Sequence, residues 1–232
     1  MSNSPGRPQI EVYPDAEHAA LAAAEAIADW LAAGLAENDR ASFVGTGGSS
    51  PGPVYDLLAT LPLPWEQVSV TLSDERWVPP TSPESNERQL RERLMVGEAA
   101  AARFIPLWSD APTAEDAAEA AEIAIEDLFP ADVVLLGMGE DGHIASLFPG
   151  SPVLEEGLDP LGGSFVIAVP TGEPAPAMER LSLTLYALKQ AYLTVVLVSG
   201  EAKRRIIEDR DDLPIQALFR ASDMPVRVIW SP

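Results

Sequence analysis

The stretch Asp132-Val-Val-Leu-Leu136, followed directly by Gly137-Met-Gly-Glu-Asp-Gly-His143, decides how this chain is expected to fold. A continuous apolar run of this length is typical of a strand covered on both faces, as in parallel sheets. The glycine-rich turn after it marks the carboxyl end of that strand. Further strands are predicted at residues 41–45, 68–72, 104–107, 165–169, 192–198 and 226–230.

Helical patterns alternate with these strands. Apolar residues recur at helical spacing in segments 15–37, 54–61, 85–96, 113–128, 201–208 and 214–219. This alternation predicts an α/β fold built on a mostly parallel sheet with helices on both faces. Residues 1–8, rich in Pro, Ser, Asn and Gly, predict a disordered tail. Residues 9–232 are expected to form a single domain.

The composition excludes several classes of site and location. The chain has no cysteine, so disulfides, thiol nucleophiles and thiolate metal sites are absent. No apolar run reaches the roughly 18 residues of a membrane span. The first residues do not form a secretory signal, so a cytoplasmic protein is expected. No metal or cofactor is predicted.

The charge of the chain limits its partners. Asp and Glu number 36 against 15 Lys and Arg, which gives a formal net charge of -21. Such a surface repels nucleic-acid phosphates and anionic lipids, so neither nucleic acid nor membrane is expected as a partner. An anionic metabolite requires a local pocket of cations and backbone N–H groups.

Four predicted strands end in loops with chemically useful residues, and ligands of open parallel sheets bind beyond the carboxyl ends of strands. The first loop is Gly45-Thr-Gly47-Gly48-Ser49-Ser50-Pro51. Its glycines allow the backbone to approach an anion. It is not a Walker loop, and Ser50 stands where a dinucleotide fingerprint has its third glycine. A tight strand-to-helix turn explains this loop equally well.

Two further loops carry charged side chains. In Ser73-Asp74-Glu75-Arg76 the carboxylate of Asp74 and the guanidinium of Arg76 are two residues apart, so in extended chain they share one side. By themselves they are better explained as a surface ion pair. Lys203 lies in the first turn of a predicted helix, where a cation opposes the helix dipole. A bound anion beside Lys203 would compensate for that cost.

The fourth loop, at Gly137–His143, holds the candidate base. His143 is one of only two histidines and follows a buried strand, with Asp141 two residues earlier and Gly142 permitting a sharp turn. A carboxylate beside a histidine can hold it in one tautomer, so that it exchanges protons near neutral pH. His18, on the first predicted helix, is expected to be exposed and without a role.

In combination, these segments resemble the 6-phosphogluconolactonase family, which is related to the glucosamine-6-phosphate deaminases. The resemblance extends from residue 45 to 203, over the runs 45–51, 73–79, 85–86, 137–149, 180–185 and 199–203. It implies a Rossmann-like domain and cofactor-independent hydrolysis of 6-phospho-D-glucono-1,5-lactone in the pentose phosphate pathway. The expected partner is therefore a small phosphosugar lactone.

The resemblance also implies roles for individual residues. His143 would be the general base, Asp141 would orient it or bind a sugar hydroxyl, and Arg76 would meet developing negative charge. The substrate phosphate would be held by a larger group, namely Gly47, Gly48, Ser49, Lys203 and Arg180. Asp74 matches a position that deaminases use for proton transfer, and we expect it to contact the substrate.

One position favours hydrolysis over deamination. The deaminases place a glutamate where this chain has Phe148, and amine elimination needs more proton-transfer groups than water addition to an ester. An isomerase or deaminase on the same fold is the rival enzyme. Two rival functions of different classes are a non-catalytic sugar-phosphate sensor and a nicotinamide-dependent dehydrogenase. The sequence does not specify the oligomeric state, and a monomer is the default.

Overall fold

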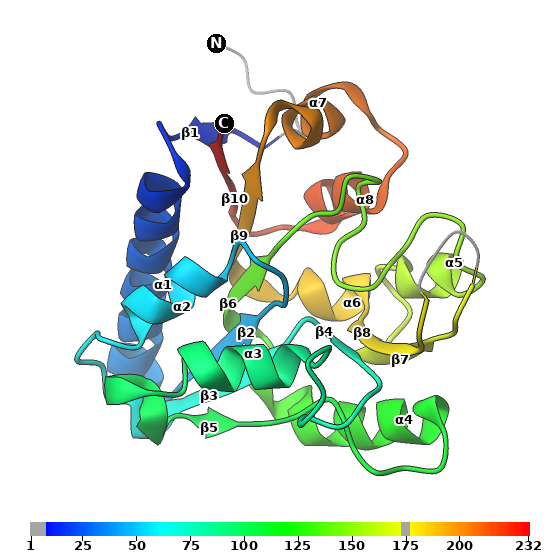
Figure 1. The fold of residues 1–232 in the computed structure, drawn as a ribbon, viewed down its shortest axis with the longest axis horizontal. Coiled ribbons are helices and arrows are strands. Elements are labelled where there is room, and N and C mark those ends of the chain that lie inside the picture. Colours follow the sequence, from blue (N-terminus) through cyan, green and yellow to red (C-terminus); the bar gives the residue numbers. More distant parts are fainter. Residues whose placement is uncertain (1–7, 173–176) are drawn as a thin grey trace.

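The computed structural model describes residues 8–172 and 177–232 (Figure 1). The tail predicted for residues 1–8 lies outside the described residues except for Pro8. The central sheet has seven strands in the order β1-β10-β9-β6-β2-β3-β5, and all of its pairings are parallel. Its strands are β1 (Ile10–Val12), β2 (Ala41–Gly45), β3 (Val68–Leu72), β5 (Arg103–Phe104), β6 (Ala131–Leu136), β9 (Ala191–Ser199) and β10 (Val226–Ser231).

Helices cover both faces of this sheet. In Figure 1, α1 and α2 lie on one side of it and α6 and α8 on the other. The α-helices are α1 (Ala16–Asn38), α2 (Gly52–Leu58), α3 (Asn86–Arg93), α4 (Ala114–Ile125), α5 (Leu154–Gly157), α6 (Leu185–Leu188), α7 (Glu201–Asp209) and α8 (Pro214–Ala221). Short 3-10 helices occupy Trp65–Gln67, Gly97–Ala101 and Glu126–Leu128. The predicted α/β class and mostly parallel sheet are therefore confirmed.

The interior strands are as apolar as the sequence indicated. All five residues of β2 are buried, as are Val133 to Leu136 of β6. β1 pairs with β10, so the first and last strands are neighbours in one sheet.

Helix α1 packs against the central sheet through small residues. It contacts β2, β6, β9 and β10, and nine of its residues are buried, most of them alanines. The helix has 23 residues, and an 18-residue stretch of it has a mean hydropathy of 1.4, so its length and composition would also suit a membrane-spanning helix. Half of that stretch is buried inside the fold. Burial against four strands is the behaviour of a core helix.

A second sheet departs from the prediction. Residues 165–169 were expected to form a strand of the same covered kind as 132–136. Instead β7 (Val166–Val169) belongs to a separate three-stranded antiparallel sheet with the order β4-β8-β7, in which β4 is Asp74–Arg76 and β8 is Arg180–Leu183. An apolar run indicates burial but not the strand with which it pairs, and among the described residues the only neighbour of β7 in its sheet is the short strand β8.

Candidate active site

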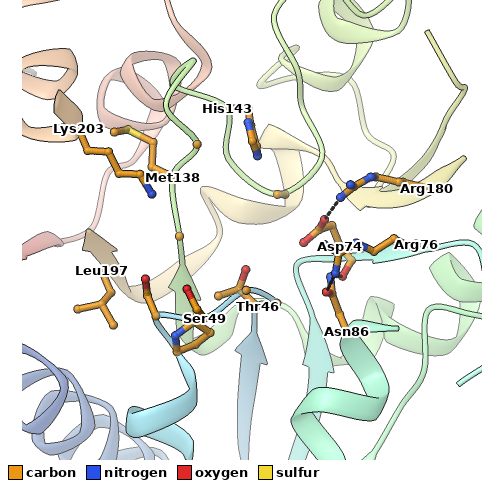
Figure 2. Close-up of a pocket in the computed structure, with 17 residues that line it drawn as sticks. Thr46, Ser49, Asp74, Arg76, Asn86, Met138, His143, Arg180, Leu197 and Lys203 are labelled. Atoms are coloured by element: carbon orange, nitrogen blue, oxygen red, sulfur yellow. Dashed lines mark hydrogen bonds and ion pairs between the residues drawn. The ribbon is translucent and has the colours of Figure 1, made fainter. Parts of the chain in front are cut away.

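A cavity of about 240 Å³ opens where β2, β6 and β9 end (Figure 2). It is lined by Thr46, Gly47, Gly48, Ser49, Ser50, Pro51, Asp74, Arg76, Asn86, Gly137, Met138, Gly139, His143, Ala145, Arg180, Leu197 and Lys203. All four predicted loops thus meet at the carboxyl edge of the parallel sheet.

Hydrogen bonds hold the glycine loop after β2 at Thr46 and at Gly48. The fully buried hydroxyl of Tyr55 donates to the carbonyl of Thr46 at 2.6 Å and accepts from its N–H at 2.7 Å. Burial raises the pKa of this phenol, so it stays protonated. Gly48 has a φ of 98° and exchanges two hydrogen bonds with the side-chain amide of Gln89. A Cβ at Gly47 would overlap the side chain of Asn86, so that position requires glycine.

Lys203 projects toward this loop from α7. Figure 2 shows its ammonium on the same side of the pocket as Ser49, with Arg180 on the opposite side. No hydrogen bond or ion pair to another described residue engages Lys203, although the chain is strongly acidic. A half-buried cation next to a glycine-rich loop suits a phosphate group, because ammonium and backbone N–H groups both donate to its oxygens.

His143 and Asp141 form the predicted pair. The imidazole Nδ1 lies 2.6 Å from Oδ1 of Asp141, and the same oxygen accepts the backbone N–H of His143 at 3.2 Å. Gly142, with a φ of 79°, supplies the sharp turn between them. A Cβ at Gly139 would collide with both side chains. Because Nδ1 is hydrogen-bonded to the carboxylate of Asp141, Nε2 is the ring nitrogen available to exchange a proton. Figure 2 shows the ring of His143 pointing into the cavity.

Phe148 contacts both His143 and Arg180. Its ring centroid lies 4.4 Å from that of His143, and the guanidinium carbon of Arg180 lies 5.2 Å from the same centroid. Phe148 is buried. An apolar ring therefore lies against the candidate base.

Arg180 and Asp74 lie together on the wall opposite Lys203. One guanidinium nitrogen of Arg180 is 3.5 Å from Oδ2 of Asp74, and the hydroxyl of Ser146 donates to that same oxygen at 2.6 Å. Burial lowers the pKa of the Arg180 guanidinium, while the Asp74 carboxylate opposes that shift. The Nε of Arg180 is buried without a partner among the described residues.

Arg76 is held by the first turn of α3. Its guanidinium donates to the side-chain oxygen of Asn86, whose own amide donates to the carbonyl of Asp74 at 2.9 Å. Behind them, the fully buried carboxylate of Glu75 accepts hydrogen bonds from the start of the same helix. Burial raises the pKa of Glu75 to about 7, and its hydrogen-bond donors oppose the shift.

The structure brings together the residues that the sequence singled out. The predicted residues that line the cavity are Gly47, Gly48, Ser49, Asp74, Arg76, His143, Arg180 and Lys203. Asp141 is not among the lining residues, but it bonds to His143. Asn86, Ser146 and Glu75 lie within the sequence runs that resemble the family, but sequence reasoning gave them no role in the site. In the described part of the chain, no group of three or more His, Asp or Glu side chains is arranged to hold a metal ion.

Comparison with known proteins shows to which family the chain belongs. The family model described as glucosamine-6-phosphate isomerases/6-phosphogluconolactonase matches residues 14–231. The chain belongs to this family. A 6-phosphogluconolactonase of Caulobacter vibrioides is 44% identical over 225 residues, which cover 96% of this chain and 97% of the relative. One from Pseudomonas aeruginosa is 37% identical over 230 residues, covering 96% and 94%. The expected family and enzyme class are confirmed.

Solved structures agree with these sequence relatives. A 6-phosphogluconolactonase from Shewanella baltica superposes with a TM-score of 0.92 at 32% identity, covering 98% of this chain and 99% of the other. A monomeric glucosamine-6-phosphate deaminase superposes with a TM-score of 0.77 at 20% identity, covering 96% and 97%. The second likeness shows a shared fold alone.

Proposed function

We propose that this enzyme hydrolyses 6-phospho-D-glucono-1,5-lactone to 6-phosphogluconate in the pentose phosphate pathway, with His143 as general base. The observation that carries the proposal is the 2.6 Å contact between Nδ1 of His143 and Asp141. It leaves Nε2 as a proton acceptor that faces a cavity lined by cations. The high identity to relatives named 6-phosphogluconolactonase supports the choice of substrate.

A lactone is an ester, so hydrolysis requires an activated water and stabilisation of a tetrahedral oxyanion. His143 removes a proton from water as the water oxygen bonds to C1, and the carbonyl electrons move to oxygen. When the carbonyl re-forms, the bond from C1 to the ring oxygen breaks, and His143 returns the proton to that oxygen. Asp141 stabilises the transient imidazolium through Nδ1. The positive charge of Arg76 stabilises the oxyanion.

The other end of the substrate is held by its phosphate. We assign this role to the backbone of Gly47, Gly48 and Ser49 together with Lys203, whose ammonium is free of protein partners among the described residues. Anchoring the phosphate positions C1 against His143, and positioning of this kind contributes to the rate alongside base catalysis. Arg180 adds positive charge on the opposite wall, where it attracts an anionic substrate despite the acidic surface.

Asp74 is better suited to positioning than to proton transfer. It is buried and accepts from Ser146 while lying beside Arg180. These contacts hold the carboxylate beside Arg180, so we propose that it orients that guanidinium and a substrate hydroxyl. The reaction needs no metal or organic cofactor, and we propose a cytoplasmic enzyme that acts as a monomer.

Phe148 distinguishes this reaction from deamination. Its ring contacts His143 and leaves no carboxylate there to assist ring opening and loss of an amine. The test is to supply the purified protein with the phosphorylated lactone and, separately, with glucosamine 6-phosphate. We expect base consumption above the spontaneous rate with the lactone and no ammonia from the amino sugar. Ammonia release without lactone hydrolysis would overturn the proposal.

A further inference from the structure

Glu75 is a buried carboxylate with no part in the chemistry described above. It lies between two residues that line the cavity, Asp74 and Arg76, in the extended strand β4. Side chains alternate along a strand, so Glu75 points away from the pocket. It is fully buried, and an ionisable side chain is rarely buried unless specific partners hold it.

The partners of Glu75 lie on both sides of one loop. Its Oε1 accepts the backbone N–H groups of Arg76 at 2.8 Å and Asn86 at 2.7 Å. Its Oε2 accepts the N–H of Glu87 at 2.7 Å and the hydroxyl of Ser85 at 3.0 Å. Three of these four donors belong to the start of α3. The single carboxylate therefore fastens α3 to β4 across the intervening residues 77–84.

This connection reaches the cavity through the side chains of α3. Asn86 binds the Arg76 guanidinium and contacts Gly47 closely enough to exclude a Cβ there. One turn later, Gln89 holds Gly48 through both its N–H and its carbonyl. The first turn of α3 thus contacts both Arg76 and the glycine loop, and Glu75 sets the position of that turn.

We propose that Glu75 is a positioning residue, which places Arg76 in the cavity by fixing the start of α3 against β4. The carboxylate acts through Asn86 and Arg76 and does not touch the substrate. Burial raises the pKa of Glu75 well above its ordinary value, as expected for a carboxylate kept for its geometry at a cost in solvation. The proposal rests on the lactone hydrolysis proposed above.

A double-mutant cycle tests whether Glu75 acts through Arg76. The variants are Glu75→Gln, Arg76→Lys and the two combined, with kcat and KM measured for lactone hydrolysis per folded molecule. Glutamine keeps the shape of Glu75 but turns an NH₂ group toward backbone donors. Displacements of about 1 Å can cost about 100-fold in rate. We expect Glu75→Gln to lower kcat/KM at least tenfold in the parental protein and less than twofold beside Arg76→Lys.

Equal losses in both backgrounds would overturn the proposal, and so would parental activity in Glu75→Gln. If Glu75→Gln does not fold, Glu75→Asp takes its place, because it keeps the charge but is one methylene too short. Asp132→Asn is the matched control: this half-buried carboxylate accepts the N–H of Ser42 far from the cavity. We expect it to change stability and leave kcat/KM within twofold.

A second readout separates this proposal from the proposed function. The same cycle is repeated on the affinity for 6-phosphogluconate, measured by titration calorimetry. Coupling between Glu75 and Arg76 in binding, in a protein that does not hydrolyse the lactone, would refute the function and support the positioning role. Hydrolysis by the parental protein with additive effects in both assays would refute the positioning role alone.

Discussion

Replacing Asp141 with asparagine tests how the imidazole of His143 is prepared for catalysis. The substitution keeps the size of the side chain and removes its charge. Oδ1 of Asp141 lies 2.6 Å from Nδ1 of His143. In the transition state the ring carries a positive charge, so the lost interaction is a charge pair that exists only there. By contrast, the phosphate-binding residues are untouched.

The distance sets the size of the effect. Two unit charges 2.6 Å apart interact by about 1.6 kcal/mol at the dielectric constant of water and by about 3 kcal/mol at a value of about 40. The Asp141 side chain is 47% exposed and that of His143 27%, so the true value lies toward the solvated limit. These energies correspond to a loss in kcat of about 15- to 200-fold. An asparagine NH₂ facing Nδ1 would favour the wrong tautomer and increase the loss.

The assay is lactone hydrolysis followed by base consumption at constant pH, corrected for spontaneous ring opening. We expect kcat to fall as stated and KM to stay within about threefold, because Asp141 is not among the residues that line the cavity. The control is Glu140→Gln, which removes an exposed carboxylate from the same turn. Parental kcat in Asp141→Asn, or an equal loss in Glu140→Gln, would refute the reasoning.

Three further changes test other parts of the site. Lys203→Ala should raise KM about 10- to 100-fold through loss of a charged hydrogen bond to phosphate. Arg205→Ala, at an exposed position of the same helix, should leave KM unchanged. Equal effects of the two substitutions in steady-state kinetics would contradict the role assigned to Lys203. Gly142→Ala should lower the free energy of unfolding by about 1–3 kcal/mol, because φ is 79° and the new Cβ would collide with Leu213. Gly163→Ala is the control, with a φ of 85° but open space around the new Cβ. Urea unfolding should show a smaller loss of stability for Gly163→Ala than for Gly142→Ala. Burial raises the pKa of the Glu75 carboxyl from 4.5 to about 7, so the folded protein binds the proton of this carboxyl more tightly than the unfolded chain does. Proton binding therefore stabilises the folded state at low pH, and this contribution is lost as pH rises through 7. Relative to Glu75→Gln, the parental protein should therefore lose about 3 kcal/mol of stability between pH 4.5 and 8, and a constant difference in urea unfolding would refute this.

Much of the site could be predicted because it follows strand ends. A buried apolar run such as residues 132–136 locates a strand in the middle of a parallel sheet, and the loops after such strands meet at one edge. Local spacing also predicted two relations correctly. Asp74 and Arg76 share one side of an extended strand, and Asp141 and His143 meet around the turn at Gly142.

The rest depends on contacts between distant segments. The antiparallel sheet pairs β4 with β8, so that Asp74 lies opposite Ser182, and nothing in either short segment specifies the other. The same alternation that placed Asp74 and Arg76 in the cavity puts Glu75 on the opposite side, but its partners at Asn86 and Glu87 are visible only once α3 is in place. In the sequence, polar residues of this kind are indistinguishable from surface residues.

The rate of lactone hydrolysis by His143→Asn, compared with the parental protein, tests the central claim most directly. Asparagine keeps a polar side chain next to Asp141 but has no ring nitrogen to accept the proton. We predict that the parental protein opens the lactone well above the spontaneous rate. We also predict that the variant loses about 10²- to 10⁴-fold in kcat while its KM changes little. Hydrolysis by His143→Asn at the parental rate would contradict the account.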